Sequence, residues 1–216
     1  MSTQGFPSAS LTDEGLPRWI GELSSKDLAY TVHAVRELEP ARALGIIGVR
    51  PARITAGVLP STRPDRWTSL PRAALGPTDA FAVLLAARVG SWTFVFDDSG
   101  STNDSGEEQL TTQLLAAEGT EAISTTSTIN ADTDLMYSLN GELTLHTTES
   151  FLDTSGYQEV PAELRAAFEA AKAFDRDQLE PGTPDTFNER MVCAHADLRF
   201  SLDELRQLPC LIGSLG

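Results

Sequence analysis

The sequence predicts an α+β domain, in which an antiparallel sheet of about five or six strands carries helices on one face and is followed by C-terminal helices. Two hairpin signals predict the sheet. Asn140-Gly141 lies between alternating apolar runs, and an Asn-Gly pair adopts the positive φ values of a type I′ turn at little cost. Gly90-Ser91 fits a two-residue turn, and the segment 92–97 (WTFVFD) that follows alternates aromatic residues with Thr and Val.

Segment 161–174 has the clearest helical pattern in the chain. Its apolar residues recur at helical spacing, and Pro161 stands in the first turn, where proline is tolerated. A later segment opens with Ser201 followed three residues on by Glu204, the spacing of a capping box. The expected helices are, in order, 16–23, 39–45, 107–118, 161–174, 185–196 and 201–208.

Alternation of apolar and polar residues predicts the strands. The Ser and Thr residues of 120–129 suit a solvated face of an antiparallel sheet. We therefore expect one covered face and one face in contact with solvent. The expected strands are, in order, 28–35, 81–89, 92–97, 120–129, 133–139 and 142–147.

The domain organisation follows from composition. Residues 1–15 have no periodicity and are predicted to be a flexible N-terminal tail, and 16–216 are predicted to form a single α+β domain. Five prolines interrupt 46–77, so we expect an irregular excursion there with at most one helical turn. Its basic cluster is expected to fold back on the acidic half of the chain; it consists of Arg63, Arg66, Trp67 and Arg72.

The charge of the chain is unevenly distributed. The net charge is −15, yet residues 1–90 carry ten Arg or Lys and eight Asp or Glu, whereas 91–216 carry six and twenty-three. Between Arg88 and Arg165 there are fourteen acidic residues and no Arg or Lys. Such a stretch repels nucleic acid and attracts basic protein surfaces. Solubility alone is the competing explanation.

No pattern in the chain predicts catalysis or a cofactor. None of the common nucleophile, metal or phosphate-loop motifs occurs, and His33, His146 and His195 fall in three different expected elements. Asp97 and Asp98 are adjacent in a strand, so their side chains point to opposite faces. The oxygen-rich segment that follows them lacks the register of a calcium-binding loop. We therefore predict a protein that is not an enzyme and has no cofactor or metal.

Nothing at the N-terminus resembles a signal peptide, and no apolar run is long enough to span a membrane. Cys193 and Cys210 lie in apolar surroundings and are expected to be buried small hydrophobic residues rather than a disulfide. These observations predict a cytoplasmic protein.

The segments GSWTFVFDDSG and GTEAISTTSTINADTDLMYSLNGEL resemble the core of a bacterial family classed as domain of unknown function 6461. The resemblance covers about residues 90–150, with a weaker similarity at 19–44. It departs from the family where Glu149 is followed by Ser150 instead of proline, and its proline-broken excursion is longer. The resemblance implies an intracellular α+β domain of high-GC Gram-positive bacteria, with no established activity and no catalytic residues.

Three functional hypotheses follow. The first is a protein-interaction domain, such as an immunity or antitoxin-like inhibitor, that binds a basic toxin surface through an acidic face. Its expected partner-binding residues are Asp97, Asp98, Asp104, Glu107, Glu108, Asp132 and Asp134. The second is a small-ligand-binding or sensor domain whose pocket lies around Trp92, Phe94, Tyr137 and Phe168. The third is a structural subunit that pairs through an exposed sheet edge, and the oligomeric state is left open.

Overall fold

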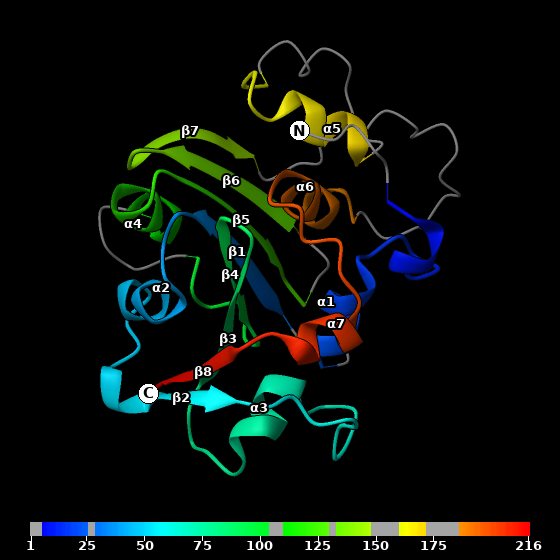
Figure 1. Cartoon of the computed structure of the whole chain (residues 1–216), viewed down its shortest axis with the longest axis vertical. Coiled ribbons are helices and arrows are strands. Elements are labelled where there is room, and N and C mark those ends of the chain that lie inside the picture. Colours follow the sequence, from blue (N-terminus) through cyan, green and yellow to red (C-terminus); the bar gives the residue numbers. More distant parts are fainter. Residues whose placement is uncertain (1–5, 26–28, 104–109, 130–132, 148–159, 172–185) are drawn as a thin grey trace.

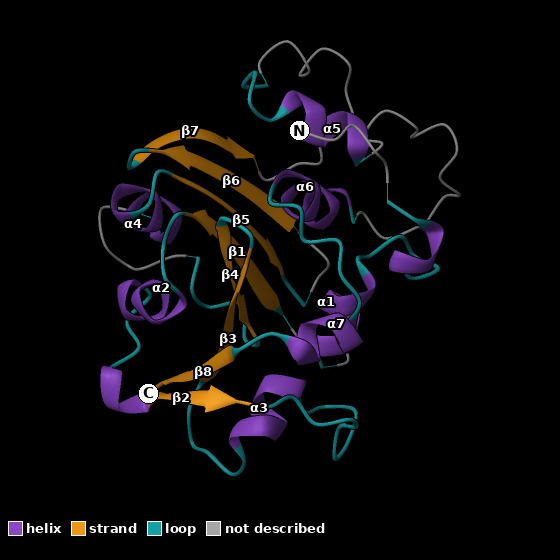
Figure 2. Cartoon of the chain, viewed as in Figure 1, coloured by secondary structure: helices purple, strands orange, loops and turns teal. Residues whose placement is uncertain are grey.

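The computed structural model describes residues 6–25, 29–103, 110–129, 133–147, 160–171 and 186–216. These residues form an α+β fold around one antiparallel sheet of eight strands in the order β2-β8-β3-β4-β1-β5-β6-β7 (Figures 1 and 2). The strands are β1 Tyr30–Arg36, β2 Ile54–Gly57, β3 Ala82–Val89, β4 Trp92–Asp97, β5 Glu121–Ser127, β6 Thr133–Leu139, β7 Glu142–Thr147 and β8 Cys210–Leu215.

Both predicted hairpins are present. Asn140 and Gly141 have φ values of 48° and 84° between β6 and β7, as a type I′ turn requires. Gly90 has a φ of 59° between β3 and β4, where Val89 pairs with Trp92. Local sequence therefore determined these two connections.

Two strands were not predicted. β8 pairs with β3 on one side and with β2 on the other, so that Ile212 lies opposite both Leu85 and Thr55. β2 and the helix α3 (Leu70–Leu75) both lie inside the 46–77 segment that was expected to be irregular. The estimate of five or six strands was therefore too low, because β2 is short and both strands pair with distant parts of the chain.

Helices cover both faces of the sheet, so the prediction of helices on one face is wrong (Figure 1). The larger core packs α1, α5, α6 and α7 against one face, and the smaller core packs α2 and α4 against the other. The uninterrupted apolar run of β3 fits this arrangement, because a strand buried on both faces does not need to alternate. The remaining helix bounds are α1 Arg18–Leu23, α2 Pro40–Ile46, α4 Thr111–Glu118, α5 Arg165–Ala170, α6 Phe187–His195 and α7 Leu202–Gln207, with 3-10 turns at Ser8–Ser10 and Pro51–Arg53.

Ser124, Thr125 and Thr126 of β5 are buried, which corrects the expectation of a solvated face. Ser124 lies 2.7 Å from Nδ1 of His33 and accepts a hydrogen bond of 2.8 Å from Thr112 in α4. Thr31 and Thr126 are hydrogen-bonded across β1 and β5 at 3.0 Å. These hydroxyls satisfy one another beneath α4, so a polar layer is buried without leaving its groups unpaired.

The expected N-terminal tail is described from residue 6 onward. Leu11 forms a bridge with Pro17, and Phe6 packs against the larger core. Cys193 and Cys210 are free and buried, as predicted. None of the described helices combines the length and the apolar character needed to cross a bilayer.

Candidate functional site

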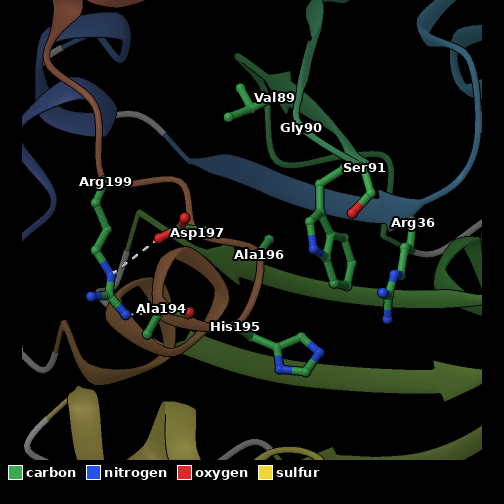
Figure 3. A pocket seen from close by; sticks show the side chains of 10 residues that line it. Arg36, Val89, Gly90, Ser91, Ala194, His195, Ala196, Asp197 and Arg199 are labelled. Carbon is green, nitrogen blue, oxygen red and sulfur yellow. Dashed lines mark hydrogen bonds and ion pairs between the residues drawn. The ribbon is translucent and has the colours of Figure 1, made fainter. Parts of the chain in front are cut away.

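A pocket of about 310 Å³ opens between the β3–β4 turn and the C-terminal end of α6 (Figure 3). We call it the Arg36 pocket. Figure 3 shows Arg36, from the end of β1, and Arg199, from the segment after α6, on opposite sides of His195. The residues that line the pocket are Arg36, Val89, Gly90, Ser91, Trp92, Ala194, His195, Ala196, Asp197 and Arg199.

The local structure places these groups. Arg36 pairs with Trp92 in the β1–β4 register, and the amide of Glu37 donates to the carbonyl of Ser91, which fixes the hairpin turn beside the end of β1. α6 ends at His195, and the chain turns away through Asp197, whose φ is 54°. Strand end, hairpin turn and helix end therefore meet at the pocket.

Glu121 lies behind the pocket wall and joins three side chains that are distant in sequence. Its Oε1 is 2.6 Å from Nε2 of His195 and accepts a 2.8 Å hydrogen bond from the hydroxyl of Tyr137. Its Oε2 is 3.5 Å from the guanidinium of Arg36. The carboxylate is thus almost enclosed, with a side-chain exposure of 8%.

These contacts favour the ionised form of Glu121. Burial opposes ionisation, but the hydrogen bond and charge of His195, followed by Tyr137 and Arg36, outweigh it and lower the pKa of Glu121. Burial, followed by the hydrogen bond to Glu121, raises the pKa of Tyr137, so its hydroxyl stays a donor. Glu121 therefore acts as a fixed acceptor that orients the imidazole of His195.

The imidazole of His195 is completely enclosed, with a side-chain exposure of 0%. Trp92 and Tyr137 meet it edge-on, with ring centroids 5.3 Å and 5.5 Å away. Its Nδ1 has no hydrogen-bond partner among the described residues. A buried polar nitrogen without a partner is unusual in a native protein.

The two arginines of the pocket differ in exposure. The side chain of Arg36 is 44% exposed, and its ion pair with Glu121 is long. The side chain of Arg199 is 13% exposed, lies 3.9 Å from the largely exposed Asp197, and stacks over the ring of Phe6. Arg36 is therefore the group best placed to meet an anion, because its guanidinium presents several donors to the pocket.

A second pocket, also of about 310 Å³, lies beside α3. Its floor contains Asp98, whose carboxylate accepts two hydrogen bonds from Arg72, at 2.9 and 3.0 Å, and one from Ser69 at 2.6 Å. Three of the five large apolar side chains that are exposed in the described residues line this pocket. We call these three, Trp67, Phe81 and Ile129, the apolar rim.

The structure separates the predicted partner-binding acids. Asp97 is fully buried and accepts backbone hydrogen bonds from Ser99, Ser101 and Thr102, so it organises the following loop. Burial raises its pKa against these hydrogen bonds. Asp98 is buried beside Arg72. Neither carboxylate is exposed as a docking residue needs to be, because both are used inside the fold.

Asp134 is partly buried and accepts hydrogen bonds from the side chain of Asn103 and the amide of Thr126, both at 2.8 Å. Burial, opposed by the Thr126 amide, raises its pKa. The other predicted acids lie outside the described residues; they are Asp104, Glu107, Glu108 and Asp132.

Arginines from the first ninety residues neutralise part of the acidic stretch. Arg72 pairs with Asp98, Arg42 with Glu118, and Arg36 with Glu121. The prediction that the basic cluster folds back on the acidic half is therefore confirmed for Arg72. Arg63 instead donates to backbone carbonyls in and just after α1, and Arg66 stacks over Trp67.

The alternative predicted pocket is present only in part. Trp92 lines the Arg36 pocket, and Tyr137 lies behind it as a partner of Glu121. Phe94 and Phe168 belong to the larger core instead. Sequence reasoning missed Arg36, Glu121 and His195. Glu121 is 85 positions from Arg36 and 74 from His195, and the one available signal was an acid at the start of a strand that is otherwise uncharged.

Within the described part of the chain, no three His, Cys, Asp or Glu side chains form a group that could hold a metal ion. Burial raises the pKa of the Cys210 thiol to about 11 and that of Cys193 further, so neither is a reactive thiolate near neutral pH.

No family model, no curated protein and no solved structure matches the chain. The resemblance to the domain-of-unknown-function family 6461 therefore stays a prediction.

Proposed function

We propose that this chain is a small-molecule-binding domain that takes a small anionic ligand in the Arg36 pocket. The observation that carries the proposal is the half-exposed guanidinium of Arg36 in a concave site whose nearest carboxylate, Glu121, is already engaged by His195 and Tyr137. Arginine binds carboxylate and phosphate groups through paired hydrogen bonds.

The walls of the pocket suit an organic anion. Trp92 and Val89 give it apolar surface, while Arg36 and Arg199 give it positive charge. Small-ligand sites combine mostly apolar walls with a few fixed polar groups, and a volume of about 310 Å³ lies at the small end of their range.

Thermal unfolding in the presence of benzoate, acetate, inorganic phosphate and the uncharged isostere benzamide tests the proposal. A bound anion at a hundredfold excess over its Kd is expected to raise Tm by about 5 to 10 °C, and benzamide is expected to have no effect. Arg36→Gln should remove the stabilisation. Arg42→Gln is the matched control, because Arg42 is also partly exposed but pairs with Glu118 and does not line the pocket. Equal stabilisation of both variants would exclude Arg36 as the anion site.

The apolar rim favours a second candidate, a protein-interaction domain. Exposed large apolar side chains that gather around one depression are typical of protein-binding surfaces. Trp67 is 51% exposed, Phe81 60% and Ile129 72%. The hypothesis of an inhibitor of a basic toxin stays a prediction of this class, without Asp97 and Asp98 as docking residues.

Co-expression with the products of the neighbouring genes tests the second candidate. Capture of such a product should be lost with Trp67→Ser and kept with Val58→Ser, since Val58 is 85% exposed but lies outside the apolar rim. Capture that survives Trp67→Ser, or the absence of any captured product, would argue against this candidate.

A further inference from the structure

β2 has one unpaired side, at the outer edge of the sheet (Figure 1). It is the last strand in the order of the sheet and pairs with β8 alone. Outside that pairing, residues 55–58 make no backbone hydrogen bond within the described part of the chain. Thr55, Ala56 and Val58 are exposed. A row of unpaired N–H and C=O groups can accept a further strand.

The two edges of the sheet differ in their protection against further pairing. β7 carries exposed Glu142 and His146, and its pairing with β6 shifts in register after Tyr137. Charges and irregular register are the usual means by which proteins protect an edge. β2 contains no charged residue and no proline, and its register with β8 is unbroken. β2 is short, so a partner that pairs with it needs an additional contact.

Arg50 and Arg53 can supply this contact. Arg50 precedes the 3-10 turn that leads into β2, and Arg53 ends that turn. Six other arginines form ion pairs within the described residues, whereas these two form none. Residues 46–66 contain four Arg and one Asp, in a chain whose net charge is −15. The N-terminal end of β2 is therefore locally basic and complements an acidic partner.

We propose that the edge of β2 binds an extended acidic segment of a partner protein, which joins the sheet as a further strand and places its acidic residues beside Arg50 and Arg53. Val58, at the other end of β2, is 85% exposed and offers an apolar contact. This inference is independent of the Arg36 pocket, because β8 and β3 separate β2 from β4.

A second copy of this chain fits the edge less well than an acidic segment does. It would bring the same uncharged strand, preceded by its own two arginines. Arg50 and Arg53 would then meet no carboxylate at the edge. Charge therefore favours a different protein as the partner.

Fluorescence anisotropy with the labelled, amidated peptide Val-Thr-Val-Thr-Glu-Glu tests the inference. The two glutamates stand at its C-terminal end because antiparallel pairing brings that end to Arg50 and Arg53. At low ionic strength we expect this peptide to bind about 10-fold more tightly than a version with lysine in place of glutamate. Added salt should weaken its binding.

Peptides N-methylated at alternate amides test the pairing itself. Alternate N–H groups of a strand point to the same side, so one of the two methylated versions should lose binding and the other should keep it. Binding should also slow hydrogen exchange at amides within 55–58 of the protein. If both versions bind like the parent peptide, or exchange there is unchanged, the edge of β2 is not the binding site.

Two double variants test the charges. Arg50→Gln with Arg53→Gln should remove the preference for the acidic peptide. Arg42→Gln with Arg88→Gln is the matched control: it changes the net charge equally, but its arginines already pair with Glu118 and Glu39. A preference that persists in the first variant would overturn the role of Arg50 and Arg53.

Three further outcomes would overturn the proposal. The acidic peptide could fail to bind, or it could bind no better than its lysine version. Sedimentation could instead show a dimer of this chain that the acidic peptide dissociates, which would assign the edge to a second copy. None of these results bears on the Arg36 pocket, so the two proposals stand or fall separately.

Discussion

His33 and His195 are both enclosed imidazoles, yet they lie on opposite faces of the sheet in opposite chemical surroundings. His33 has a neutral hydroxyl at each nitrogen, Ser124 at 2.7 Å and Thr102 at 2.9 Å. His195 has a carboxylate at Nε2 and no partner at Nδ1 among the described residues. Both nitrogens of the first ring are hydrogen-bonded to hydroxyls, whereas the second ring is held at one nitrogen by a carboxylate.

The difference shows how burial alone fails to identify function. Burial lowers the pKa of His33 to about 3, so that this histidine stays neutral, and its hydroxyl partners match a neutral ring. Glu121 instead holds Nε2 of His195 through one carboxylate oxygen and faces Arg36 with the other. The groups at the two nitrogens therefore distinguish these histidines, which burial does not.

The largest expected effect is the loss of folding stability at low pH that His33 causes. Below pH 6.5 the unfolded chain binds a proton at His33 that the folded protein takes up only near pH 3. The free energy of unfolding therefore falls by about 1.4 kcal/mol for each pH unit below 6.5, to a total loss of roughly 4 to 5 kcal/mol. Urea unfolding at pH 7, 6 and 5 measures it, and His33→Gln should flatten the dependence. The same slope in the variant would show that His33 is not buried neutral.

The next largest effect is expected at the carboxylate that holds His195. Glu121→Leu leaves the Tyr137 hydroxyl and Nε2 of His195 without an acceptor, which should lower the free energy of unfolding by about 3 kcal/mol. Glu118→Leu is the control, since its ion pair with Arg42 is exposed and should contribute less than about 1 kcal/mol. Similar losses in both variants would contradict the central role of Glu121.

A smaller effect should distinguish two buried serines. Ser124→Ala removes the hydroxyl that contacts His33 and Thr112, and should cost about 1 to 2 kcal/mol. Ser138, on the neighbouring strand, is equally buried, but its hydroxyl has no partner in the described part of the chain. Ser138→Ala should therefore be neutral or slightly stabilising. Chemical unfolding of the two variants gives the comparison, and equal losses would refute the hydrogen-bonded layer around His33.

The smallest effect on stability is expected for Arg36→Gln. Its long, partly solvated ion pair with Glu121 should contribute less than about 1 kcal/mol to the free energy of unfolding. Arg72→Gln is the contrast, because it leaves buried Asp98 without two hydrogen bonds and should cost about 2 to 3 kcal/mol. A large loss for Arg36→Gln would mean that Arg36 is structural and not available to a ligand.

The six predicted strands and both hairpin turns were available from the sequence because they depend on local properties. Asn140-Gly141 takes positive φ values readily, and alternation along 92–97 sets one face of β4 against the larger core. The Ser201 capping box is present for the same reason: Ser201 accepts from the amide of Glu204 at 3.2 Å. Local conformational preference was sufficient in each case.

Burial of the polar face could not be predicted in the same way. The Ser and Thr residues of β5 suit a solvated surface, and only the packing of α4 over His33 and Ser124 shows that they form a buried layer. Asp98 was likewise expected at the surface, because nothing in its local sequence shows that it pairs with Arg72, 26 positions away. A local pattern reports polarity, and tertiary packing decides whether that polarity faces water or a partner.

The sequence by itself therefore determined where most strands, turns and helices of this protein lie, since φ preferences and apolar periodicity act within a few residues. Only the tertiary structure decided which side chains meet. β8 belongs to the sheet because it pairs with β2 and β3. Glu121 in β5 contacts Arg36, Tyr137 and His195, which lie in three other elements. Such contacts depend on the pairing of distant segments, and the Arg36 pocket is formed where these segments come together.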